Sequence, residues 1–83
     1  MIRSRTVRSE ALFVSPLQPS DRAGIAQVEA AIVVVVRRFG DRGVAERVAQ
    51  EFGDHPESAV ARMRWARELA DGSAAASALP VAA

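Results

Sequence analysis

The strongest constraint in the sequence is a break at Gly53-Asp54-His55-Pro56, which separates two amphipathic stretches. Proline disfavours the helical conformation for the residue before it, so His55 should lie outside a helix that begins at Pro56 and ends near residue 71. The stretch before the break should form a helix over about residues 43 to 53 and end at Gly53 in the left-handed conformation of a helix C-terminus. Two short helices joined by so short a break must cross at a steep angle, which is helix-turn-helix geometry. The apolar residues of the first stretch recur at spacings of three and four: Val44, Ala45, Val48, Ala49 and Phe52.

Residues around this break follow the pattern of a known motif: Val48, Ala49, Glu51, Phe52, Gly53, Pro56, Glu57 and Ser58. The region, about residues 44 to 68, resembles the helix-turn-helix of transposase-type bacterial DNA-binding proteins. The resemblance implies a DNA-binding or transcription-associated protein whose third helix is the recognition helix. Asp54 stands where that family usually carries an apolar residue. Arg62 stands where that family often carries a tryptophan. The whole chain also resembles short, alanine- and arginine-rich proteins of high-GC actinobacteria.

The third helix carries candidate DNA-binding residues. Arg62, Arg64 and Arg67 could contact guanine edges or phosphates if the face of the helix around Met63 is anchored in the core. Arg64 and Arg67 could instead form ion pairs on the helix surface, with Glu57, Glu68 or Asp71 as partners. Glu57 lies at the end of the helix that would enter the groove, where a negative charge repels phosphate.

A further helix is predicted over residues 23 to 39, with Ser20 or Asp21 as its cap and Gly40 at its end. The five β-branched residues at 32 to 36 have strand propensity, but the flanking helix formers keep the helical period. Val33 and Val34 then point away from the core, either as lone exposed valines or as a patch for a second copy of the chain. The core stripe of this helix is Ile25, Val28, Ile32, Val35, Val36 and Phe39.

The two ends of the chain lack a helical period. Residues 1 to 10 should form a flexible basic arm, which either reaches DNA or is a solvated tail, and its arginines are Arg3, Arg5 and Arg8. After this arm, Leu12 and Phe13 should belong to an extended strap that packs over the helices or inserts into the groove of a partner. Residues 11 to 71 form the helical domain, and residues 72 to 83 should be a disordered tail.

Length and composition narrow the class of protein. The chain has 83 residues, a net charge of +1 and no cysteine, so we expect one small domain without disulfides. The net charge gives no reason to expect nonspecific affinity for nucleic acid, which only a local cluster of arginines could supply. The apolar run from Ala30 to Val36 spans seven residues, far too few to cross a membrane, and the amino terminus lacks the apolar segment of a signal peptide. We therefore expect a cytoplasmic location and no membrane partner.

Nothing in the sequence predicts catalysis. His55, the single histidine, has Glu51, Asp54 and Glu57 nearby, but its position is explained by the end of one helix and the start of the next. The chain lacks lysine, tyrosine and a glycine-rich phosphate loop. We expect no enzyme activity, no metal site, no cofactor and no small-molecule substrate.

The sequence therefore predicts an all-α, three-helix domain with two alternative functions. The first is a small DNA-binding helix-turn-helix protein that uses Arg62, Arg64 and Arg67, supported by the arginines of the arm. The second is a protein-protein interaction module, a homodimer or an adaptor, whose contact residues are Leu12, Phe13, Val33, Val34 and Trp65.

Overall fold

The chain forms three α-helices and one 3-10 turn in a computed structural model that describes residues 4–78. The helices are α1 (Arg5–Val14), α2 (Ile25–Asp54) and α3 (Pro56–Ala78), and the 3-10 turn η1 (Pro19–Asp21) lies between α1 and α2. The described residues contain no β-strand. The prediction of a small all-α domain with three helices is therefore confirmed.

Helix α2 is bent at Gly40, where φ is 69° and ψ is 166°. Side chains are strained in this region of backbone space, which is populated almost entirely by glycine. The bend divides α2 into a first arm, residues 25 to 39, and a second arm, residues 41 to 54. These arms correspond to the predicted helices at 23 to 39 and 43 to 53, so the break expected at Gly40 is confirmed.

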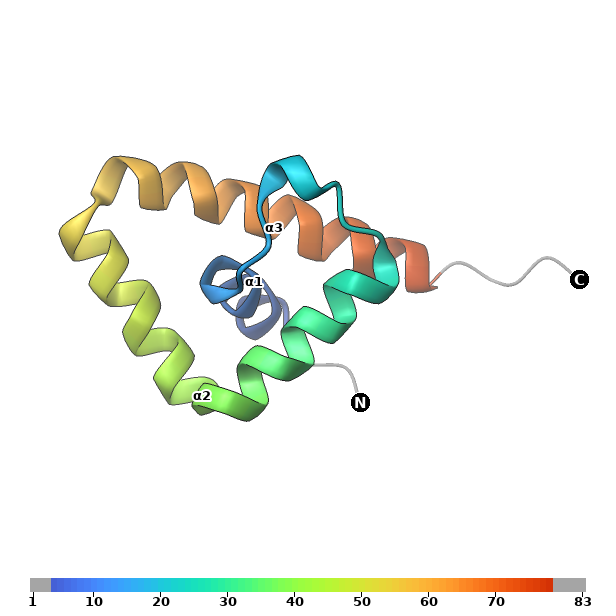
Figure 1. Ribbon diagram of the computed structural model, residues 1–83, viewed down its shortest axis with the longest axis horizontal. Coiled ribbons are helices and arrows are strands. Elements are labelled where there is room, and N and C mark those ends of the chain that lie inside the picture. The colour runs from blue at the N-terminus through green and yellow to red at the C-terminus, as the bar shows by residue number, and fades with distance from the viewer. Residues whose placement is uncertain (1–3, 79–83) are drawn as a thin grey trace, which may run out of the picture.

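Helix α1 lies at the centre of the molecule, surrounded by the two arms of α2 and by α3 (Figure 1). The flexible arm predicted for residues 1 to 10 and the extended strap after it are therefore wrong from Arg5 onward. Ser4 caps the new helix, because its Oγ accepts a hydrogen bond from the backbone N–H of Val7 at 3.2 Å. Leu12 and Phe13 are buried instead of being offered to a partner.

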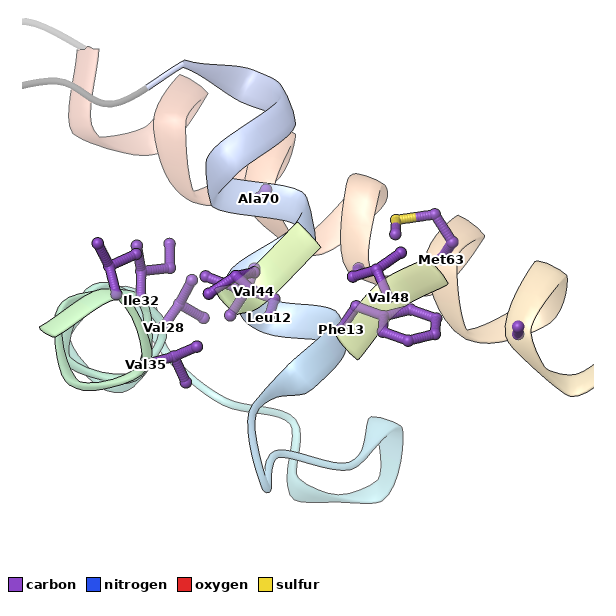
Figure 2. Close-up of a cluster of buried hydrophobic side chains, with 13 residues drawn as sticks. Leu12, Phe13, Val28, Ile32, Val35, Val44, Val48, Met63 and Ala70 are labelled. Atoms are coloured by element: carbon purple, nitrogen blue, oxygen red, sulfur yellow. The ribbon is translucent and has the colours of Figure 1, made fainter. Parts of the chain in front are cut away.

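The hydrophobic core forms where α1 meets both arms of α2 and α3. Leu12 lies beside Val44, with residues of the first arm on one side and Phe13 and Val48 on the other (Figure 2). Helix α3 contributes mostly small side chains to this core, which allows its backbone to approach α1 closely. The buried apolar residues of α3 are Ala59, Met63, Ala66 and Ala70.

Several predicted helix ends differ from the structure. Gly53 remains inside α2 and has no left-handed conformation, and the helix ends at Asp54 with His55 as its C-cap. Pro56 begins α3 as predicted, but the helix continues to Ala78, so the expected disorder is wrong for residues 72 to 78. Residues 79 to 83 of the predicted tail lie outside the described residues.

The start of α2 also differs from the prediction. Ser20 and Asp21 belong to η1, and Gly24 is the N-cap of α2. The backbone N–H of Gly24 donates a hydrogen bond to Oε1 of Gln27 at 3.0 Å. Ile25, predicted to be a core residue, is exposed at the first position of the helix.

Candidate functional site

Arg62, a predicted DNA contact, is turned toward the end of α1. Its Nε donates a hydrogen bond to the backbone oxygen of Phe13 at 2.7 Å, and its Nη2 donates to those of Ser15 and Leu17, both at 2.9 Å. Carbonyl groups at a helix C-terminus lack partners within the helix, so the guanidinium supplies the missing donors. It also lies over the ring of Trp65, 4.7 Å from the ring centroid. Arg62 therefore holds α1 against α3.

Burial affects the electrostatics of Arg62. Desolvation lowers the pKa of its guanidinium, and the carboxylate of Glu51 opposes this shift. Arginine remains charged even when buried, so the three carbonyl oxygens are contacted by a full positive charge. Three hydrogen bonds to backbone oxygens leave this side chain poorly placed to contact a phosphate.

Two arginines of the predicted arm form ion pairs between helices. Arg8 of α1 donates two hydrogen bonds to the carboxylate of Glu29 in α2, which also accepts one from Oγ of Ser73 in α3 at 2.7 Å. Arg5 donates to both carboxylate oxygens of Asp71, each at 2.9 Å. These arginines hold α1 in place, and Arg3 lies outside the described residues.

Arg64 and Arg67 remain available on the surface of α3. Both are exposed, and neither has a hydrogen bond or an ion pair with another described residue. Of the six arginines predicted to bind DNA, the described residues leave only these two without a partner. Arg5, Arg64 and Arg67 line one cavity beside α3, but Arg8 and Arg62 do not, so the structure gathers only part of the predicted arginine set.

The first arm of α2 carries an exposed apolar face, which we call the valine face and define as Ala26, Ala30, Val33 and Val34. All four residues are exposed, Val33 at 43% and Val34 at 62%. Spacings of three and four place them on one side of the helix, opposite the buried stripe. The prediction that Val33 and Val34 point away from the core is confirmed.

The remaining residues of the predicted interaction surface are not free. Leu12 and Phe13 belong to the core, so the prediction that they contact a partner is wrong. Trp65 is half-buried and is packed against the core and Arg62. The sequence does not indicate α1 because its helical period is interrupted by charged side chains that pair with residues far along the chain.

A groove between α1, the second arm of α2 and α3 was not predicted from the sequence. It consists of two adjoining cavities of about 450 and 320 Å³ that share Arg5, Phe52, Met63 and Arg67. Its α1 wall carries Thr6, Ser9 and Glu10. The sequence could not indicate this groove because α1 itself was not predicted.

The surroundings of His55 show no metal centre. Its Nδ1 lies 3.4 Å from Oε2 of Glu51, and both side chains are exposed. Within residues 4–78, no group of three or more histidine or acidic side chains is arranged to hold a metal ion. No helix in the same part of the chain combines the length and apolar character needed to cross a membrane.

The fold and its surfaces define a small all-α domain with one central helix, an exposed valine face and a mixed-charge groove. Comparisons of the chain with protein-family models, curated proteins and solved structures give no match.

Proposed function

We propose that this protein is a non-enzymatic helical interaction module that associates with a second copy of itself through the valine face. The observation that carries the proposal is the exposure of Val33 and Val34, at 43% and 62%, on the first arm of α2. Isolated exposed apolar residues are ordinary, but these two extend a stripe with Ala26 and Ala30.

The shape of the valine face favours a second copy as the partner. Its small residues, Ala26 and Ala30, lie toward the start of α2, and its larger residues, Val33 and Val34, lie toward the bend. In an antiparallel two-fold pair, the valines of each copy would pack over the alanines of the other. Four short side chains offer less area than the roughly 800 Å² per partner of a standard interface, so the dimer should be weak and concentration-dependent.

The proposal is tested by sedimentation velocity over a range of concentrations. The wild type should shift from monomer to dimer as its concentration rises, and Val34→Glu should remain monomeric because the charge would be buried in the pair. Ala45→Glu is the matched control, since Ala45 is exposed on the second arm, outside the valine face. A wild type that stays monomeric at the highest concentration, or a Val34→Glu variant that still dimerises, contradicts the proposal.

DNA binding through the outer side of α3 is the second candidate function. The observation in its favour is that Arg64 and Arg67 are exposed and unpaired among the described residues, on the helix that resembles a recognition helix. The inward orientation of Arg62 reduces the arginine set available for this role. The salt dependence of DNA binding distinguishes this function from self-association.

A further inference from the structure

The groove between α1, the second arm of α2 and α3 carries apolar and polar side chains that take no part in the proposed self-association. Its floor is formed by Val48, Phe52 and Met63. The ring of Phe52 stacks on that of Phe13 in the core, with ring centroids 5.8 Å apart. Val48 and Met63 lie next to Phe13 on this side of the core (Figure 2). An aromatic ring and a thioether side by side form an adaptable apolar surface, suited to a phenyl or branched alkyl group.

Ser9 provides the polar group that points to a ligand. Only 2% of this residue is exposed, and its Oγ has no hydrogen-bond partner within residues 4–78, although the residue lines the larger cavity of the groove. A buried hydroxyl without a partner is costly and uncommon in folded proteins. A ligand atom in the cavity that accepts a hydrogen bond from Ser9 would remove this cost.

Two charged side chains on the cavity wall are also without partners. Arg67 of α3 and Glu10 of α1 form no hydrogen bond or ion pair with other described residues. Arg5, which also lines the cavity, is already bound to Asp71 through both carboxylate oxygens. The cavity wall therefore carries one cation, one anion and one almost fully buried hydroxyl above an apolar floor, all three without a partner among the described residues.

We infer that the groove binds a free α-amino acid with a large apolar side chain. The carboxylate of the ligand would accept hydrogen bonds from Arg67 and Ser9, and its ammonium group would donate to Glu10. The apolar side chain would cover Phe52 and Met63. The cavity, at about 450 Å³, lies within the range of about 300 to 1,000 Å³ that is typical of small-molecule sites.

The test is an NMR titration of the full chain with L-phenylalanine, followed through the backbone amide signals. Saturable shifts are expected for residues around Ser9, Phe52 and Arg67. Phenethylamine lacks the carboxylate, 3-phenylpropionate lacks the ammonium group and glycine lacks the apolar side chain, so each should bind about tenfold more weakly or worse. Absence of saturable binding of phenylalanine at millimolar concentration, or equal binding of all four compounds, overturns the inference.

Variants assign the binding to the groove. Ser9→Ala, Arg67→Gln and Glu10→Gln should each weaken phenylalanine binding about tenfold, because each removes a hydrogen bond that involves a charged group. Arg42→Gln is the matched control, since Arg42 is exposed and lines neither cavity. Unchanged affinity in all three groove variants would place the ligand elsewhere and contradict the inference.

The inference is separable from self-association. Ser9→Ala should fold at least as well as the wild type, because it removes an unpartnered hydroxyl, so lost binding in that variant would not reflect unfolding. Val34→Glu should bind phenylalanine like the wild type, because Val34 does not line the groove.

Discussion

Nε of Arg62 lies 2.7 Å from the backbone oxygen of Phe13, which joins the second turn of α3 to the last turn of α1 across 49 residues of sequence. The same guanidinium donates to the oxygens of Ser15 and Leu17, where the chain leaves α1. A residue expected to contact DNA therefore secures the central helix of the domain.

Arg62→Ala should destabilise the domain by about 2 to 3 kcal/mol, because it leaves carbonyl groups near the core without their charged donor. Arg64→Ala, the matched control on the same helix, should change stability by less than about 0.5 kcal/mol, because Arg64 is exposed and has no partner within residues 4–78. Urea denaturation followed by circular dichroism measures both values. Equal stabilities for the two variants would refute the role assigned to Arg62.

Gly40 and Gly53 should respond in opposite ways to alanine. At Gly40, where φ is 69°, a side chain is strained, so Gly40→Ala should cost about 1 to 3 kcal/mol. Gly53 is helical with open space around the position of a Cβ atom, so Gly53→Ala should stabilise the domain by roughly 0.5 to 1 kcal/mol. Thermal unfolding of the two variants shows whether each substitution raises or lowers the stability of the domain. A destabilised Gly53→Ala variant would argue for a left-handed turn at Gly53.

The ion pair between Arg8 and Glu29 should make stability depend on pH in the acid range. The hydrogen bonds from Arg8 lower the pKa of Glu29 in the folded state, against an opposing effect of burial, and Ser73 adds to the lowering. A carboxyl whose folded pKa lies below its unfolded value stabilises the fold above the unfolded value, near 4.5, and loses this contribution as the pH falls through the folded pKa.

Glu29→Gln should therefore be less stable than the wild type at neutral pH, and the difference should shrink in acid. Glu46→Gln is the control, since Glu46 is exposed on the second arm of α2 and has no ion pair among residues 4–78. Urea midpoints measured from neutral pH down to about one unit below the usual carboxyl pKa test this. Parallel curves for the wild type and Glu29→Gln would exclude a contribution from the pair.

DNA binding should depend steeply on salt and on Arg64 and Arg67, which are exposed on α3 and have no partner among the described residues. Contacts between arginine and phosphate release counterions, so affinity for duplex DNA should fall sharply between about 50 and 200 mM salt. Arg64→Ala and Arg67→Ala should each weaken binding and reduce the salt slope by about one. A fluorescence anisotropy titration measures these values. No binding at the lower salt concentration would remove DNA from the candidate partners.

Local patterns in the sequence were sufficient for the helical conformation of both arms of α2 and for the start of α3, but not for the two ends of α2. The period of Val28, Ile32, Val35 and Val36 outweighed the strand propensity of the valine run, because the flanking residues keep the same helical stripe. Pro56 determined where α3 begins through the conformational restriction that it places on its neighbour. Both effects act within a few residues, so they can be recognised in the sequence without knowledge of the tertiary structure.

Only the tertiary structure decided the conformation of residues 5 to 14 and the roles of the arginines. A segment of ten residues is too short to be a stable helix by itself, and α1 is held by Glu29, Asp71 and Arg62, which lie far along the chain. The extension of α3 past residue 71 has the same cause, since Ser73 is buried and bonded to Glu29. An arginine becomes a surface charge, half of an ion pair or a helix cap according to what the packed helices place beside it, and no local sequence pattern contains that information.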